Sequence, residues 1–168
     1  MPPARPRAAP AVLLALLGLA CRTPDPRQEV ELRDLEGYWA VDPAVGETRY
    51  LAPVVRSKLY NKAAEAWSIQ AMATFRREGD DQTWSASAIV SPIKDRPLEK
   101  GQSALVVLKP EGEGRYTYRG EVTDMLKHEA FKDFTATVFV KVGRSSWTRF
   151  ADVKIERRLG THAVDTFQ

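Results

Sequence analysis

Hydrophobic and polar residues alternate with the period of a β-strand along much of the chain after residue 35. The alternation is clearest over residues 67–75, where every second residue is apolar, namely Trp67, Ile69, Ala71, Ala73 and Phe75. A period of two places one set of side chains on a buried face and the other set on the solvent face. This segment therefore predicts a strand that lines the core.

The same pattern predicts the other strands, over residues 35–41, 54–60, 83–90, 103–109, 115–119, 134–142 and 147–157. Pro53 has no N–H donor, so the second strand is expected to begin near Val54 or to lie at a sheet edge. Phe150 is one step out of phase with the apolar residues Val153 and Ile155. This offset predicts a β-bulge near residues 149–151.

Residues 123–132 interrupt the β pattern. Thr123 and Asp124 are candidate N-caps, and Met125 and Leu126 follow them. Capping residues directly before apolar residues favour a helix start. One short helix is therefore predicted near residues 124–132.

Seven or eight short strands and one small helix are typical of an all-β sandwich or barrel. Residues 91–101 contain two prolines and are too long for a tight hairpin, which suits a chain that crosses between two sheets. We therefore expect an immunoglobulin- or fibronectin-like sandwich over residues 35–158, followed by a frayed tail over residues 159–168. A small lipocalin-like barrel is the alternative.

The first 20 residues have the composition of a secretory signal peptide. Arg5 and Arg7 precede a short apolar run that ends in Leu19 and Ala20. The run is about half the ~20 residues that a membrane-spanning helix needs. Residues 22–34 hold Pro24, Pro26 and many charges, which predicts an extended tether before the domain.

The apolar run is followed by Cys21, the only cysteine of the chain. The leader resembles bacterial lipoprotein signals, in which the cysteine becomes the lipidated N-terminus. Ala20 fits that motif, whereas Gly18 departs from it. The resemblance implies lipid attachment at Cys21 in the cell envelope, and Arg22 in place of aspartate favours the periplasmic side of the outer membrane. Ordinary secretion with a free Cys21 thiol remains open.

Part of the domain, about residues 54–109, loosely resembles FxLYD-type and related immunoglobulin-like domains. The motifs are Asn61 after a strand, Phe75-Arg-Arg-Glu-Gly79 and Leu98-Glu-Lys-Gly101. Arg-Arg-Glu replaces the family's Tyr-Asp part, and Lys100 stands where proline is usual. The family serves adhesion or assembly, so the resemblance implies no catalytic residues.

Gly37-Tyr38-Trp39 is similar to the Gly-x-Trp of lipocalins. A tryptophan that closes one end of any β core explains the same triplet. The resemblance implies a carrier of a small apolar ligand as the alternative function.

Charge argues against nucleic acid as a partner. Arg5 and Arg7 lie in the leader, which leaves 23 of the 25 basic residues against 22 acidic ones after cleavage. No basic block is present that could follow a phosphate backbone. A domain without a cysteine pair must be stabilised by burial and strand pairing.

Candidate chemistry is sparse. His128 and His162 are isolated, so neither a metal site nor a cofactor is expected. The acidic residues of the loop after residue 77 lack the spacing of a calcium loop, and Ser103 lacks the second glycine of a nucleophile elbow. An enzyme is therefore not expected.

We instead expect a membrane-anchored envelope lipoprotein that binds another envelope protein. The candidate partner surface consists of aromatic residues outside the main apolar phase, namely Tyr116, Tyr118, Phe131 and Phe139. The alternative is that these rings form a second cluster beneath the helix at residues 123–132.

Overall fold

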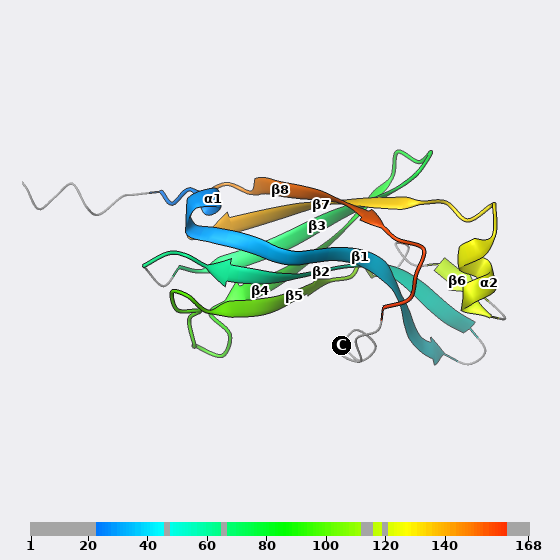
Figure 1. The fold of residues 1–168 in the computed structure, drawn as a ribbon, viewed down its shortest axis with the longest axis horizontal. Coiled ribbons are helices and arrows are strands. Elements are labelled where there is room, and N and C mark those ends of the chain that lie inside the picture. Colours follow the sequence, from blue (N-terminus) through cyan, green and yellow to red (C-terminus); the bar gives the residue numbers. More distant parts are fainter. Residues whose placement is uncertain (1–22, 46–47, 65–66, 112–115, 119–120, 161–168) are drawn as a thin grey trace, which may run out of the picture.

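The computed structural model describes residues 23–45, 48–64, 67–111, 116–118 and 121–160, and two antiparallel sheets make up most of them (Figure 1). In chain order the elements are α1 (Pro26–Glu29), β1 (Val30–Val45), β2 (Thr48–Asn61), β3 (Ile69–Arg77), β4 (Thr83–Ser91), β5 (Ser103–Leu108), β6 (Tyr116–Tyr118), α2 (Val122–Lys127), β7 (Phe134–Val142) and β8 (Thr148–Ile155). The sheets do not close into a barrel. The predicted all-β sandwich is confirmed, and the barrel alternative is wrong.

The strands divide into two sheets. The first sheet has the order β1-β2-β5, and β6 pairs with the other end of β2. The second sheet has the order β4-β3-β7-β8. The connection from β4 to β5 therefore crosses from the second sheet to the first, as the sequence predicted for residues 91–101.

The core lies between the sheets and is lined by the predicted apolar faces. Ile69, Ala71, Ala73 and Phe75 of β3 are completely buried, and the alternate residues of β7 from Phe134 to Val142 are at most 2% exposed. Burying the faces of two central strands supplies the hydrophobic driving force of the fold. Trp67 lies before β3 and is only half-buried.

The predicted β-bulge is present in β8. Val138 of β7 pairs with Ala151, and the next residue, Phe139, pairs with Arg149. Phe150 is thus the extra residue that no β7 residue opposes. This extra residue shifts the alternation by one position, so that core-facing residues are found on both sides of the bulge.

Strand β2 begins at Thr48, before Pro53, and not near Val54 as predicted. The strand continues through Pro53, which lies opposite Trp39. The backbone of Trp39 bonds away from β2, to Arg158 and Gly160, so the Pro53 nitrogen also faces away from β1. On that side β6 pairs with residues 49–51 and β5 with residues 55–60. The missing donor therefore falls in the gap between two partner strands.

The folded part begins earlier than the predicted boundary at residue 35. Pro24 and Pro26 are buried, and β1 begins at Val30. The carbonyl of Glu29 accepts hydrogen bonds from the N–H groups of Lys62 (2.8 Å) and residue 63 (3.1 Å). The segment expected to be a tether is therefore packed against the domain from Pro24 onward.

The chain after β8 joins the two sheets along one side. Glu156 donates its N–H to the Gly37 carbonyl (3.1 Å), and Trp39 donates to the Arg158 carbonyl (2.9 Å). The N–H of Gly160 then bonds the Trp39 carbonyl (2.9 Å). Leu159 and Gly160 are thus packed on β1, although the sequence predicted a frayed tail from residue 159. Residues 161–168 lie outside the described part.

Helix α2 is present but shorter than predicted. It ends at Lys127, and His128 is its C-cap. The chain then turns, and the Phe131 N–H bonds the His128 carbonyl (3.0 Å). This turn directs Phe131 into the core, where the residue is 6% exposed.

Candidate functional site

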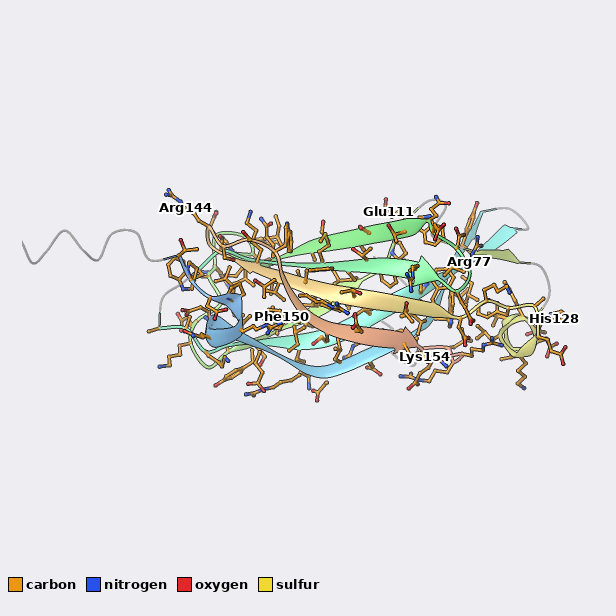
Figure 2. All side chains as sticks on the ribbon, turned by 90° about the horizontal axis from the view of Figure 1, so that it is seen from above. Arg77, Glu111, His128, Arg144, Phe150 and Lys154 are labelled. Carbon is orange, nitrogen blue, oxygen red and sulfur yellow. The ribbon has the colours of Figure 1, made fainter. Side chains whose placement is uncertain are left out.

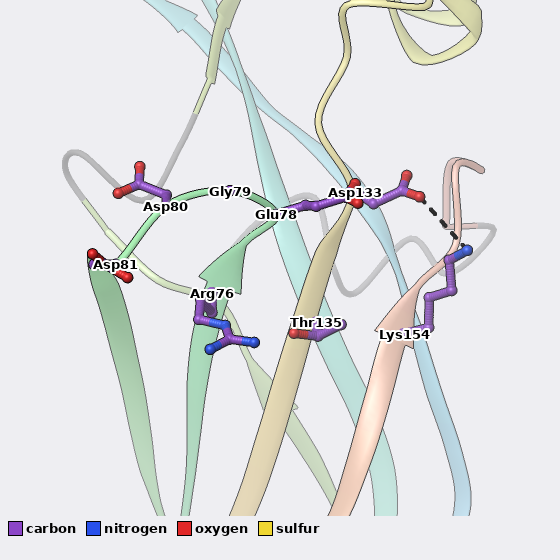
Figure 3. Close-up of a pocket in the computed structure, with 8 residues that line it drawn as sticks. All are labelled: Arg76, Glu78, Gly79, Asp80, Asp81, Asp133, Thr135 and Lys154. Atoms are coloured by element: carbon purple, nitrogen blue, oxygen red, sulfur yellow. Dashed lines mark ion pairs between the residues drawn. The ribbon is translucent and has the colours of Figure 1, made fainter.

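A polar hollow of about 590 Å³ lies at the end of the second sheet that carries the β3–β4 hairpin (Figure 3). Arg76, Thr135 and Lys154 stand side by side on adjacent strands. The other lining residues belong to the hairpin and to the start of β7, namely Glu78, Gly79, Asp80, Asp81 and Asp133. Six of the eight lining residues are charged, so the hollow does not suit an apolar ligand.

Two of the four acidic residues of this hollow, Asp133 and Asp80, are paired with cations. Asp133 accepts a hydrogen bond from Arg157 Nε (2.6 Å) and lies 3.6 Å from Lys154 Nζ. The hydrogen bond from Arg157 lowers the pKa of Asp133, against the opposing effect of burial. Hydrogen bonds from the Gln82 N–H and from Arg77 likewise lower the pKa of Asp80. A general acid needs a raised pKa, whereas the pKa of each of these two carboxylates is lowered.

A second network ties the C-terminal segment to the first sheet. Glu36 of β1 accepts hydrogen bonds from Arg56 Nη1 (3.0 Å) and Arg158 Nη2 (2.9 Å). Burial raises the pKa of Glu36, but the hydrogen bonds from the two arginines outweigh it and leave the pKa lowered. Arg158 also bonds Glu156 (2.6 Å). The network stabilises the fold where the chain after β8 reaches β1.

The two predicted surface aromatics whose side chains are described, Phe131 and Phe139, do not lie on one surface. The Phe131 ring packs edge-on against Trp39, with 5.0 Å between centroids, in the core. Phe139 is half-buried on the outer face of the second sheet, between Met72 and Arg149. The prediction that Phe131 is exposed was therefore wrong, because the turn after α2 places it between the sheets. Phe139 lies on the opposite face.

Tyr116 and Tyr118 form the ends of β6. Their backbone pairs with Leu51 and Arg49 of β2, which confirms the predicted strand. Their side chains lie outside the described part, so their place in a partner surface stays a prediction.

The outer edge of β4 is the described feature best suited to binding another protein. Its outward residues Thr83, Ser85, Ser87 and Ile89 are all exposed, and Ile89 is 65% exposed. β4 pairs with β3 on one side and is the last strand of the described second sheet on the other. An edge strand presents free N–H and C=O groups to which another strand can bond.

The direction of these backbone groups follows from the β3 ladder. The carbonyl of Ser68 and the N–H of Glu78 both bond toward β7, so the even-numbered residues of β3 face β7 and the odd-numbered ones face β4. Ser87 lies opposite Met72, an even-numbered residue. The N–H and C=O of Ser87 therefore point to the free edge, and alternation gives Ser85 the same direction.

The other strands at the sheet edges have protection that residues 83–89 of β4 lack, since the register shift of β4 lies beyond them, between Ile89 and Ser91. β8 has a bulge and three charged residues, namely Arg149, Asp152 and Lys154. β1 is bonded to the chain after β8, and β5 has only six residues. Residues 83–89 of β4 contain no charge, proline or register shift. Natural proteins usually protect a long edge by one of these devices.

Sequence reasoning placed β4 correctly but missed its edge. A signal was present, since the strand Thr-Trp-Ser-Ala-Ser-Ala-Ile-Val-Ser has no charged residue. Period-two alternation does not tell which strands are neighbours, so it could not distinguish an edge from a centre.

The leader (residues 1–20) and Cys21 lie outside the described residues. Within the described ranges, no helix has the length and apolar composition that crossing a bilayer requires. In the same ranges, no group of three or more histidine, cysteine, aspartate or glutamate side chains is arranged to hold a metal ion.

Comparison with known protein families, with curated proteins and with solved structures finds no match to this chain.

Proposed function

We propose that this protein is a lipid-anchored lipoprotein of the bacterial cell envelope whose sandwich binds another envelope protein and catalyses no reaction. The leader supports the anchor, because Arg5 and Arg7, a short apolar run and Cys21 follow one another in the order of a lipoprotein signal. Arg22 after the cysteine supports the periplasmic side of the outer membrane. The free edge of β4 supports the binding function.

The edge of β4 is the main support for the binding function, because its backbone can form hydrogen bonds with another strand. An extended segment that adds to a sheet edge gains main-chain hydrogen bonds, and the side chains around the edge give specificity. Trp84, Ala86 and Ala88 face the core but remain partly exposed beside this edge. The surface is uncharged and partly apolar, so it fits an extended partner segment with small or apolar side chains.

Acylation of Cys21 tests the anchor. Cells grown with a fatty-acid analogue should incorporate the label into the wild-type protein and not into Cys21→Ser. Mass spectrometry of the native product should show the loss of residues 1–20. A labelled Cys21→Ser variant, or a native product that retains Met1 and carries no acyl group, would refute the anchor.

A photo-crosslinking residue at position 85 tests the binding edge in intact cells. We expect an adduct with another envelope protein, and no adduct from the same residue at position 149 on the opposite edge of the second sheet. Ser87→Pro should abolish the adduct, because proline removes an N–H that points to the free edge.

Ser87→Thr is the matched control, since it keeps the N–H and the strand propensity and should leave the adduct unchanged. An adduct with twice the mass of this chain would show self-association and contradict the binding of another protein. Equal adducts at positions 85 and 149 would refute the role of β4.

The interior does not favour the lipocalin-like carrier. The two sheets pack on the rings of Trp39, Phe75 and Phe134, and the hollow described above is polar and lies on the outer face of the second sheet. An apolar cargo would need an apolar cavity.

A further inference from the structure

The exposed large hydrophobic residues of the described part gather toward one end of the sandwich. They are Ile89 (65% exposed), Ile93 (53%), Leu105 (44%) and Trp147 (38%). Single exposed apolar side chains are common on any protein. Ile89 and Leu105 lie on the outer faces of different sheets, whereas Ile93 and Trp147 lie in the connections at the tip of the same end, where they can contact one partner or membrane surface.

The strand register places these residues at the end that carries α1. Ile89 lies two residues before the end of β4, and Ile93 lies in the connection that follows the strand. Leu105 lies two residues after the start of β5, and Trp147 directly precedes β8. Figure 1 shows α1 at this end, and Figure 2 shows Arg144 of the β7–β8 connection projecting there. We call this the α1 end.

The N-terminal segment is fixed to the same end. The Asp25 side chain caps α1 by accepting the Arg27 N–H (3.1 Å). Arg27 Nη2 donates to the Arg149 carbonyl (2.9 Å) on the second sheet, and Lys62 Nζ donates to the Arg27 carbonyl (2.9 Å) from the end of the first. Helix α1 is thus bonded to both sheets.

The distance from Cys21 to the domain is therefore short. Thr23 is the first described residue, and Pro24 directly after it is buried against the domain. Cys21 and Pro24 are three residues apart, and three residues span at most about 11 Å when fully extended. A lipid on Cys21 would thus hold the α1 end against the bilayer, whereas a tether over residues 22–34 would have allowed the domain to move away.

We propose that the α1 end rests on the lipid surface, with Trp147 and Ile93 in the interfacial layer of the membrane. The proposal rests on the lipid attachment at Cys21 proposed above. Tryptophan prefers this layer, because its ring is apolar and its N–H can bond to headgroups. Once the lipid is inserted, contact of the loops becomes intramolecular, so even a small apolar surface is sufficient.

Charge can add to this contact only on anionic lipids. Basic side chains outnumber acidic ones at the α1 end, where Arg27, Lys62, Lys94, Arg96, Lys100 and Arg144 lie with Asp25, Glu29, Asp95 and Glu99. Anionic lipids attract such a surface, whereas zwitterionic lipids do not. A phosphatidylcholine bilayer therefore tests the apolar side chains by themselves.

This orientation stands the strands upright on the membrane. β3 has nine residues, so the β3–β4 hairpin would lie about 30 Å above the lipid surface. The free edge of β4 would then run from the membrane toward the periplasm, where an extended partner segment can reach it.

The test uses the acylated full-length product in phosphatidylcholine vesicles that contain brominated lipid. A fluorophore is attached to Ser146→Cys at the α1 end or to Asp81→Cys in the β3–β4 hairpin. We expect quenching at position 146 to exceed that at position 81 by about threefold or more, given the strand length of about 30 Å between them. Adding Trp147→Ser and Ile93→Ser should reduce the quenching at position 146 by about half or more, because the side chains that enter the interface are removed.

The outcomes separate the two proposals. An acylated protein that binds the vesicles but shows equal quenching at both positions overturns the orientation and leaves the anchor intact. The same conclusion follows if the Trp147→Ser and Ile93→Ser changes have no effect. A product that carries no acyl group on Cys21 in its mass spectrum overturns the anchor and, with it, this orientation.

Discussion

Gly37 lies where the chain of β8 crosses β1, and replacing it with alanine tests how closely the two strands approach. A Cβ atom on Gly37 would lie 2.7 Å from the Lys154 carbonyl oxygen and 2.9 Å from side-chain atoms of Val153 and Ile155. The two side chains can rotate, but the carbonyl belongs to the backbone. Gly37→Ala must therefore displace β8 from β1.

The magnitude follows from the size of this displacement. Reaching ordinary contact at 3.4 Å requires the strand to move by about 0.7 Å. Overpacking of this kind costs about 1–3 kcal/mol. The movement also weakens the nearby hydrogen bond from Glu156 to Gly37, worth about 1 kcal/mol. Alanine reduces the entropy of the unfolded chain, which offsets about 0.4–1 kcal/mol, so the net loss should be about 2–3 kcal/mol.

Equilibrium urea unfolding, followed by tryptophan fluorescence, measures this loss. With a slope of about 2 kcal/mol per molar urea, the midpoint should fall by about 1–1.5 M. Gly37→Ala combined with Val153→Ala serves as the control, because it removes one side-chain contact and keeps the carbonyl contact. Recovery of the wild-type midpoint in the double variant would refute the reasoning, and so would a Gly37→Ala loss below about 0.5 kcal/mol.

Three further predictions concern the core, the ion pairs and the β4 edge. Phe75→Ala should lower the free energy of unfolding by about 3–5 kcal/mol because Phe75 is fully buried. Trp67→Ala should lower it by only about 1–3 kcal/mol because Trp67 is half-buried. Urea unfolding compares the two variants, and equal losses would contradict the different burial of the two residues. The hydrogen bond from Arg157 lowers the pKa of Asp133, so this ion pair stabilises the fold above about pH 4, and the stabilisation is lost as the pH falls through the lowered pKa. In a series of unfolding curves at different pH, Asp133→Asn should remove this pH-dependent part of the free energy of unfolding, which is less than about 1 kcal/mol. Ile89→Lys should leave the unfolding midpoint unchanged and abolish the adduct at position 85, and an unchanged adduct would argue against the β4 edge.

Periodicity located most strands because burial on one face imposes it. Residues 67–75 and 134–142 alternate without interruption, and the structure buries the predicted faces of both strands except for half-buried Trp67, which lies before β3. The bulge near Phe150 was also predictable, since an inserted residue leaves a visible change of phase. Local sequence carries this information because each residue's exposure depends on which side of its own strand it occupies.

The start of β1 and the path of β2 were less accessible to sequence reasoning. Residues 22–34 look like a tether because prolines and charges dominate them, yet Val30 begins a strand in which Glu31 and Arg33 face solvent. Pro53 is tolerated within β2 because two different strands pair on either side of it. Both outcomes depend on the neighbouring strands, which lie far away along the chain.

The candidate sites also divide into features that the local sequence shows and features that depend on neighbouring strands. The sequence indicated a leader and a single cysteine, and it selected four aromatic residues as a partner surface. The structure places Phe131 and Phe139 on opposite sides of the second sheet, and it draws attention instead to the uncharged edge of β4. Whether a strand lies at the edge of a sheet depends on the order of the strands, and period-two alternation gives no information about that order.

The sequence by itself determined the all-β class, the position of most strands, the bulge and the chain's crossing between sheets, because each of these leaves a local pattern of burial or turn chemistry. Only the tertiary structure decided that the segment after residue 23 packs on the domain, that Phe131 belongs to the core and that β4 is the last strand of the second sheet among the described residues. The physical reason is that these features depend on contacts between residues distant in sequence, most clearly where residues 156–160 bond to β1.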